Sequence, residues 1–126
     1  MRNERAVRGF MELLGFEEAY RGYVAAWQAL CIFTRAAPGT TPIEFVIAEG
    51  GPLKEFNKGV GGVHHVAVRV PDLEAATAKL AAKGVEMLSK TPVKGAGPFL
   101  CNFIAPVYTQ GAVIELVEVL PEGTAP

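Results

Sequence analysis

The sequence predicts an α+β protein made of two copies of one small module, the first of which lacks its opening strand. The main observation is an internal repeat, because landmark residues in the two halves recur at a nearly constant offset. The pairs are Gly15 and Gly84, 69 residues apart, Cys31 and Cys101, 70 apart, and Glu44 and Glu115, 71 apart. The order of segments agrees, with strand, helix and three strands in the second half and helix and three strands in the first. A glycine-rich segment separates the halves.

The first half is predicted to begin with a helix over residues 3–14. Asn3 can cap its amino end, and Gly15 suits the left-handed conformation that often ends a helix. Apolar residues recur between them at helical spacing, namely Val7, Phe10 and Leu14.

Three strands are predicted after this helix, over residues 17–23, 26–34 and 42–48. These segments are rich in β-branched and aromatic side chains, and a turn cluster at 36–41 separates the last two. Alternation in the third strand puts Ile43, Phe45 and Ile47 on one face and Glu44, Val46 and Ala48 on the other.

A linker is predicted over residues 51–62, between an amino-terminal half-module over 1–50 and a complete module over 63–120. Its glycines and one proline favour turns, and it encloses a predicted helical turn at 53–58. Residues 121–126 are expected to form a frayed tail.

The second half opens with a predicted strand over residues 63–70 that holds both histidines of the chain. Alternation places His64, Val66, Val68 and Val70 on one face and His65, Ala67 and Arg69 on the other. The first face is apolar and is expected to pack against a core. The second is small and polar around an imidazole, which is typical of a strand that lines a cavity.

One helix and three strands are predicted to complete this half. Asp72 can cap a helix over 73–83, whose apolar side carries Leu73, Ala76 and Leu80. The predicted strands cover residues 85–88, 99–104 and 112–120, with a polar loop at 89–98. A counterpart of His65 in the first half would precede residue 1, so the opening strand is missing there.

Composition and charge exclude several classes of function. The chain has 126 residues, half of them apolar, and a net charge of −1, with no basic run that could follow a phosphate backbone. Nucleic acid is therefore not an expected partner, and no apolar segment is unbroken enough to span a membrane. Without a recognisable secretory signal, Cys31 and Cys101 are expected to be reduced thiols of a cytoplasmic protein, packed as small hydrophobic residues.

His65, Glu44 and Glu115 are the candidate metal ligands. Each points to the side of its strand opposite the bulkiest residues, so the three would converge if these faces of the two modules met in one cleft. Imidazole and carboxylate suit a divalent ion such as Co, Ni, Mn, Zn or Fe. An ionised Glu115 between Val113 and Val117 is costly to bury unless it is paired or bound to a cation. For Glu44, which follows a loop, simple exposure to solvent is a stronger alternative.

Three segments resemble motifs of one protein superfamily. They are VHHVAVRVPDLEAA at 63–76, KGV at 83–85 and GAVIELVE at 111–118. Their order and spacing resemble the vicinal oxygen chelate superfamily, which includes glyoxalase I, methylmalonyl-CoA epimerase, extradiol dioxygenases and bleomycin- or fosfomycin-resistance proteins. The likeness covers nearly the whole chain and is greatest to methylmalonyl-CoA epimerase. It implies a glyoxalase-like fold of two βαβββ modules whose curved sheets enclose a cleft.

The resemblance also implies a ligand set and a reaction. Metal-dependent members take four ligands from the first and last strands of each module, which carry over onto Glu44, His65 and Glu115, while the fourth has no counterpart. Such a site would act as an isomerase or lyase on a small α-carbonyl or acyl-thioester substrate, through an enediolate, with Glu115 as the catalytic proton carrier. Epimerases place an acidic residue in the segment aligned with 25–28, and this chain has none there.

A second function remains open, in which the fold binds a small molecule without metal, as resistance proteins do. Aromatic residues could line such a cleft, although aromatic side chains at strand spacing usually pack in a core. They are Trp27, Phe33, Phe99, Phe103 and Tyr108. Under either function the missing strand leaves a sheet edge uncovered, which predicts a homodimer.

Overall fold

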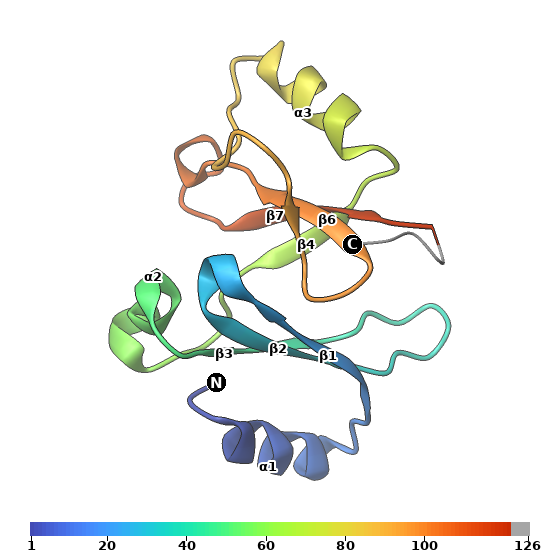
Figure 1. Cartoon of the computed structure of the whole chain (residues 1–126), viewed down its shortest axis with the longest axis vertical. Coiled ribbons are helices and arrows are strands. Elements are labelled where there is room, and N and C mark those ends of the chain that lie inside the picture. The colour runs from blue at the N-terminus through green and yellow to red at the C-terminus, as the bar shows by residue number, and fades with distance from the viewer. Residues whose placement is uncertain (122–126) are drawn as a thin grey trace. The chain divides into compact units, whose positions relative to one another are not determined.

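The computed structural model describes residues 1–121 of the chain. The chain divides into two compact units, with the boundary between Val63 and His64. Each described unit is an α+β module with one helix against one sheet, as predicted (Figure 1). Of the tail predicted over 121–126, residues 122–126 lie outside the described part.

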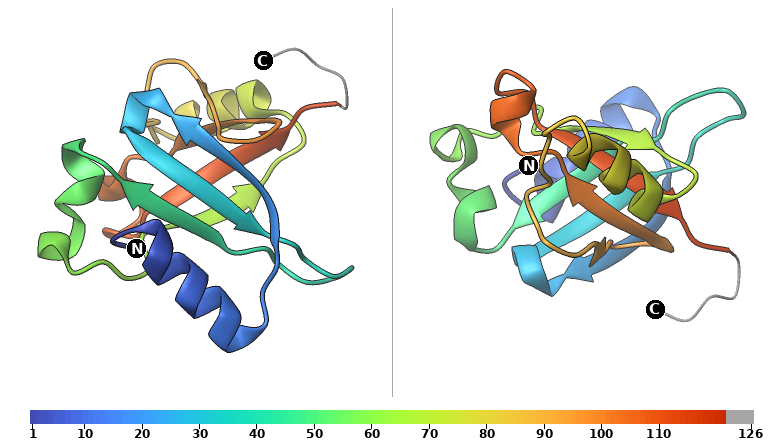
Figure 2. Two further views of the ribbon diagram at one scale, coloured as in Figure 1. Left: turned by 60° about the horizontal axis from the view of Figure 1, so that its bottom comes forward. Right: turned by 90° about the horizontal axis from the view of Figure 1, so that it is seen from above.

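The first unit contains one long helix and a three-stranded antiparallel sheet of order β1-β2-β3. Its elements are α1 (Glu4–Leu14), β1 (Glu18–Val24), β2 (Ala29–Thr34) and β3 (Glu44–Ala48). Helix α1 lies against one face of this sheet in Figures 1 and 2. The prediction of a helix and three strands without an opening strand is confirmed for the described chain.

Local signals define helix α1. The Asn3 side chain accepts a hydrogen bond from the Ala6 N–H at 2.8 Å, and Gly15 ends the helix at φ 72°. The buried stripe differs from the predicted one, because Met11 is buried and Leu14 is 53% exposed. The core of this unit contains Val7, Met11, Ile32 and Phe45.

Short helical turns connect the strands of the first unit. They are η1 (Ala25–Trp27), α2 (Gly51–Lys54) and η2 (Phe56–Gly59). The prediction that β2 starts at residue 26 is wrong, because η1 and the left-handed Gln28, at φ 50°, precede it. The predicted turn at 53–58 falls within α2 and η2.

The second unit has the predicted order of strand, helix and three strands. Its elements are β4 (Val66–Arg69), α3 (Leu73–Ala81), β5 (Val93–Lys94), β6 (Phe99–Phe103), η3 (Pro106–Tyr108) and β7 (Ile114–Val119). The sheet order is β4-β7-β6-β5, and β4 runs parallel to β7 while the other pairs are antiparallel.

Two predictions for this unit are wrong. The strand expected at 85–88 is only a single bridge from Met87 to Ile104, and β5 lies in the segment expected to be a loop. The β4 face expected to be buried is open, since Val66 and Val68 are 57% and 44% exposed. Strand β4 is an edge strand, and α3 packs over its neighbour β7.

Equivalent rows of residues cross the two sheets. Phe33 is the register partner of Glu44 as Phe103 is of Glu115, and Cys31 is the partner of Val46 as Cys101 is of Val117. Both cysteines are buried thiols, as predicted. The two halves that repeat in sequence therefore also share the same strand register, and equivalent residues lie opposite each other in the β2–β3 and β6–β7 pairs.

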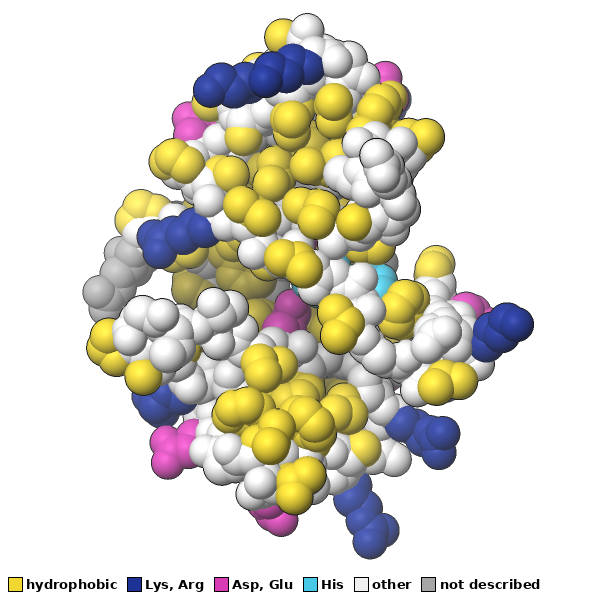
Figure 3. All heavy atoms as spheres, turned by 180° about the vertical axis from the view of Figure 1, so that it is seen from behind, with side chains coloured by type: hydrophobic (Ala, Val, Ile, Leu, Met, Phe, Trp, Pro, Cys, Tyr) yellow, Lys and Arg dark blue, Asp and Glu magenta, His cyan; other side chains and the backbone are white. Residues whose placement is uncertain are grey.

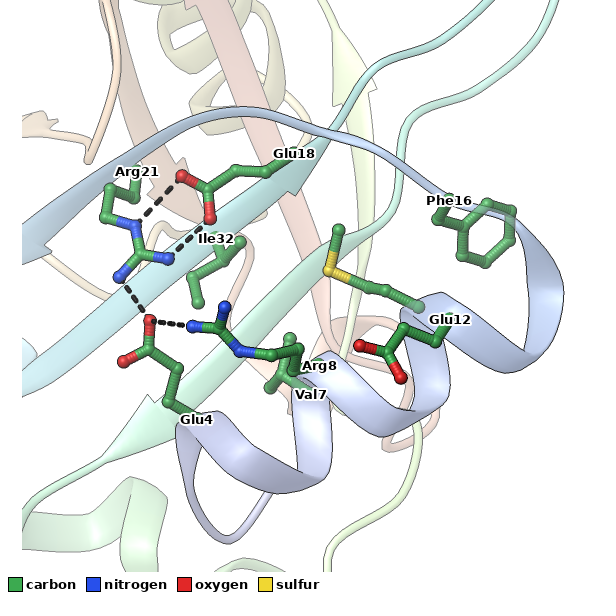
Figure 4. Close-up of a pocket in the computed structure, with 9 residues that line it drawn as sticks. Glu4, Val7, Arg8, Glu12, Phe16, Glu18, Arg21 and Ile32 are labelled. Carbon is green, nitrogen blue, oxygen red and sulfur yellow. Dashed lines mark hydrogen bonds and ion pairs between the residues drawn. The ribbon is translucent and has the colours of Figure 1, made fainter.

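A cavity of about 170 Å³ lies beside helix α1 (Figure 4). Its floor includes the buried residues Val7 and Ile32. At its rim, the Arg21 guanidinium donates to Glu18, at 3.0 Å from Nε, and to Glu4, at 2.5 Å from Nη1. These hydrogen bonds raise the pKa of Arg21 and join α1 to β1. None of the predicted site residues lines this cavity.

Candidate functional site

His65 and Glu115 approach each other within the second unit. His65 directly precedes β4, Glu115 lies on the neighbouring strand β7, and Ala67 is the register partner of Glu115. The His65 Nε2 atom is 3.6 Å from a Glu115 carboxylate oxygen, with side chains 12% and 4% exposed. Parallel pairing of β4 with β7 therefore brings an imidazole to a buried carboxylate.

The His65 ring is held by two neighbouring rings. Phe103 of β6 meets it edge-on, with centroids 5.4 Å apart and planes at 83°. The second ring is that of His64. The Nδ1 atoms of His65 and His64 lie 3.0 Å apart, so one of these two nitrogens donates and the other accepts. When His65 is the donor, its Nε2 lone pair faces Glu115 and can coordinate a cation.

The sequence analysis did not predict that the His64 ring contacts the His65 ring. Alternation of the strand assigned His64 to an apolar, core-facing side. The two rings meet because the chain at residues 64 and 65 lies before the regular strand, which begins at Val66. The adjacent pair of histidines was the available signal.

Asn102 and Glu118 hydrogen-bond to backbone groups, whereas Glu115 faces the His65 imidazole. The buried Asn102 side chain bonds the backbone N–H and C=O of Ser89, at 3.2 and 2.9 Å. Glu118, also on β7, accepts a hydrogen bond from the Leu73 N–H at 2.7 Å and fastens the start of α3. One β7 carboxylate thus anchors a helix, while the other faces an imidazole.

Glu44 lies on β3 of the first unit and is half-buried. Its register partner Phe33 stacks on Tyr20 of β1, with centroids 4.5 Å apart and planes at 14°. Burial raises the pKa of Tyr20, and the charges of Glu44 and Cys31 raise it further. The solvent-exposed alternative considered for Glu44 does not describe its half-buried environment.

The donor chemistry of these side chains fits a metal ion. A neutral imidazole and carboxylates are ligands for first-row divalent cations. A buried carboxylate such as Glu115 also gains from a nearby cation, because an isolated ionised carboxylate is costly to keep away from water. The residues present therefore suit a divalent ion in the second unit.

The aromatic residues considered as a cleft lining do not share one environment. Phe33 and Phe99 are 9% exposed, whereas Tyr108 is 43% exposed. Trp27 and Phe103 are half-buried. Phe33 and Phe99 are therefore buried side chains, whereas Tyr108 is exposed.

Surface features restrict the kinds of partner. On the face in Figure 3, Lys and Arg side chains stand apart from one another instead of forming a continuous basic patch. Among residues 1–121, no helix has the length and apolar character needed to cross a bilayer.

Comparison with protein families assigns the chain. Residues 2–103 match the family model of the Glyoxalase/Bleomycin resistance protein/Dioxygenase superfamily. The chain belongs to this superfamily, as its motifs predicted. Among curated proteins, none matches the chain.

Solved structures with the same fold include methylmalonyl-CoA epimerases. The Mycobacterium tuberculosis enzyme is 25% identical, with 97% of this chain and 84% of that chain covered and a TM-score of 0.88. A variant of the Streptomyces coelicolor enzyme, in complex with 2-nitronate-propionyl-CoA, is 20% identical, with coverage of 95% and 91% and a TM-score of 0.84. A hypothetical protein from Bacillus halodurans is 21% identical, with coverage of 99% and 92% and a TM-score of 0.83. The predicted glyoxalase-like α+β fold is confirmed.

Proposed function

We propose that this protein is a metal-dependent isomerase or lyase that moves a proton next to the carbonyl of a small α-carbonyl or acyl-thioester substrate, through an enediolate. The observation that carries the proposal is the approach of His65 Nε2 to the buried Glu115 carboxylate, at 3.6 Å. Superfamily membership and the similarity to methylmalonyl-CoA epimerase support the substrate class.

We further propose that Glu44 joins His65 and Glu115 as a metal ligand. The repeat supports this, since Glu44 occupies on β3 the register position that Glu115 occupies on β7. One imidazole and two carboxylates form a set that could hold a metal ion.

Each residue then has a separate task. When bound, a divalent ion would supply Lewis-acid stabilisation of the charge that develops on the substrate oxygen. Glu115 takes the proton from the carbon next to the carbonyl and returns it, as a general base and acid held beside the substrate. His64 is a positioning residue that keeps the His65 Nε2 lone pair directed at the site.

The first test measures bound metal. The full chain, purified without chelators and dialysed against Co²⁺ or Zn²⁺, should retain metal, whereas His65→Ala should retain little. Glu74→Gln is the matched control, because Glu74 is an exposed carboxylate in the first turn of α3. Equal, negligible metal in the wild type and His65→Ala would refute the metal proposal.

The second test measures proton transfer. Methylmalonyl-CoA in D₂O should exchange its C2 proton in the presence of metal-loaded protein, followed by NMR. Glu115→Gln should lower the rate by about 10²–10⁴-fold, the usual contribution of a general base. Metal binding without exchange would exclude this substrate, and binding of acyl-CoA that is independent of metal would favour the alternative small-molecule-binding function.

Assembly and location complete the proposal. We propose a homodimer, because β3 and β5 are edge strands in the described sheets and unpaired edges favour association. Light scattering at micromolar concentration tests this, and a monomer would contradict it. We also propose a reducing cytoplasmic location, which the two buried thiols, Cys31 and Cys101, support.

A further inference from the structure

Tyr20, Phe33 and Glu44 form one row of side chains across the sheet of the first unit. Tyr20 of β1 and Glu44 of β3 are both register partners of Phe33, which lies on the central strand β2. The Tyr20 ring stacks on the Phe33 ring, with centroids 4.5 Å apart and planes at 14°. The row therefore continues from β1 across β2 to β3.

Phe33 and Glu44 are close neighbours in this row. The Thr34 N–H donates to the Ile43 C=O at 3.0 Å, so the next residues along, Phe33 and Glu44, form a pair without backbone hydrogen bonds. Side chains approach most closely in pairs of this kind. The Phe33 side chain thus stands between those of Tyr20 and Glu44.

This row lies on the face of the sheet that helix α1 does not cover. Arg21 and Ile32 line the cavity beside α1 (Figure 4), and Phe45 packs in the core with α1 residues. Each member of the row is adjacent in sequence to one of these three residues, so alternation puts the row on the opposite face. Among the paired residues of the described strands, Tyr20 alone supplies a hydroxyl group on that face. The others there, besides Phe33 and Glu44, are Gly22, Val24, Ala29, Cys31, Val46 and Ala48.

The Tyr20 hydroxyl is available to a ligand. The residue is 40% exposed, and its hydroxyl donates to no group among residues 1–121. Tyr23 of the same strand differs, because its hydroxyl donates to Glu49 at 3.1 Å. A tyrosine hydroxyl keeps its proton at neutral pH, and burial and nearby charges raise the pKa of Tyr20 further. This group is therefore a hydrogen-bond donor.

The repeat indicates that folding does not require a hydroxyl group at this position. In the second unit the bridge from Met87 to Ile104 makes Leu88 the neighbour of Phe103, and the Leu88 N–H donates to the Phe103 C=O at 2.7 Å. Phe103 is in turn the register partner of Glu115. An exposed aliphatic side chain thus takes the place of Tyr20 in the equivalent row.

We propose that Tyr20 is a specificity-determining residue, whose hydroxyl donates a hydrogen bond to a carboxylate on the acyl group of the substrate. The inference rests on the proposed function, because Glu44 as a metal ligand brings the substrate to this row. A carboxylate is the expected partner, since hydrogen bonds to a charged oxygen are the stronger ones. Stacking on Phe33 restrains the Tyr20 ring, so less side-chain freedom is lost when the substrate binds.

The test compares methylmalonyl-CoA with propionyl-CoA, which lacks only this carboxylate. Calorimetry with the full chain measures both Kd values, in the presence of Zn²⁺ and separately with chelator. Tyr20→Phe removes the hydroxyl and keeps the stacked ring. It should weaken methylmalonyl-CoA about tenfold, as expected for a hydrogen bond to a charged group, and leave propionyl-CoA unchanged.

Tyr23→Phe is the matched control. Tyr23 lies three residues further along β1, on the opposite face of the sheet, and its hydroxyl is already bonded to Glu49. Loss of this hydroxyl should change the Kd of neither ligand. Circular dichroism of both variants checks that the sheet still folds.

Proton exchange supplies a second readout. Because the carboxylate does not react, Tyr20→Phe should raise KM for C2 exchange of methylmalonyl-CoA about tenfold and leave kcat unchanged. An equal change in both Kd values, no change in either, or binding of neither ligand at millimolar concentration would overturn the role of Tyr20. Exchange by the wild type with an unchanged Kd ratio in Tyr20→Phe would reject that role and leave the proposed function standing. Neither exchange nor bound metal, with a tenfold change in the ratio, would reject the proposed chemistry and retain Tyr20 as a donor to a ligand bound without metal.

Discussion

Gly95 allows the closest packing of any glycine whose surroundings are described, and replacing it tests the structure directly. A Cβ atom added there would lie 2.6 Å from Cδ2 of the Phe99 ring and still closer to two other ring atoms. Phe99 cannot move freely, since the residue is 9% exposed and its C=O accepts the Gly95 N–H at 3.0 Å. Gly95→Ala must therefore displace a packed aromatic ring in the sheet that carries Glu115.

The expected cost follows from two opposing effects. Overpacking of this kind costs about 1–3 kcal/mol. Loss of glycine's freedom in the unfolded chain returns roughly 0.4–1 kcal/mol. A net loss of about 1–2 kcal/mol should lower Tm by roughly 3–10 °C for a chain of this size.

Urea unfolding followed by circular dichroism measures this loss in a double-mutant cycle. Phe99→Leu shortens the side chain that the new methyl group would meet, so Gly95→Ala should be almost neutral in that background. Gly9→Ala is the control, because an added Cβ at Gly9 meets nothing within 4 Å and alanine favours the interior of α1. An equal loss from Gly95→Ala in both backgrounds, or no loss in the wild type, would refute the reasoning.

Three further predictions concern titration, ion pairing and capping. Burial and the Glu44 charge raise the pKa of Tyr20 above 10.0, so its contribution to stability is complete below that pH and is lost as the pH rises through the raised value. Tyr20→Phe keeps the ring on Phe33 and should reduce this alkaline loss, measured by urea unfolding on either side of pH 10.0. Arg21→Gln should cost only about 0.5–1 kcal/mol in unfolding experiments, and less at high salt, because the side chain is 39% exposed. Asp72→Ala removes the cap that accepts the Ala75 N–H at 2.9 Å and should cost about 1 kcal/mol, with a small loss of helical dichroism.

The helices and the longer strands could be predicted because their signals are local. Asn3 and Asp72 cap α1 and α3 as predicted, and Gly15 ends α1 in the left-handed conformation. The repeat then added information that neither half contains alone. It made Cys31 and Cys101 equivalent positions of the two halves, and both are buried in equivalent rows of the two sheets.

The errors arise where tertiary structure decides. Strand β5 has only two residues, Val93 and Lys94, too few to show alternation. Alternation in β4 predicted one buried face, but all four residues of this edge strand are exposed, and Val66, assigned to a core, is 57% exposed. Very short strands and edge strands are therefore difficult to predict from their own sequence.

The candidate site was predictable in part. An ionised carboxylate between two valines is costly to bury without a partner, and the structure places Glu115 beside His65. The adjacent histidines were a signal for the contact between His64 and His65, but strand alternation placed the two rings on opposite faces, because it does not show that the regular strand begins only at Val66. Which nitrogen of an imidazole faces outward is a property of geometry, and residue spacing does not specify it.

The hydrogen bond from the Leu73 N–H to Glu118 has a consequence for the distant end of the same strand. Side chains on a strand alternate between its faces, so sliding β7 by a single residue would turn Glu115 away from the imidazole. Glu118 resists that slide, because it would have to release the first turn of α3. Loss of the hydrogen bond between Glu118 and the Leu73 N–H would therefore make the orientation of the Glu115 carboxylate toward His65 less well defined.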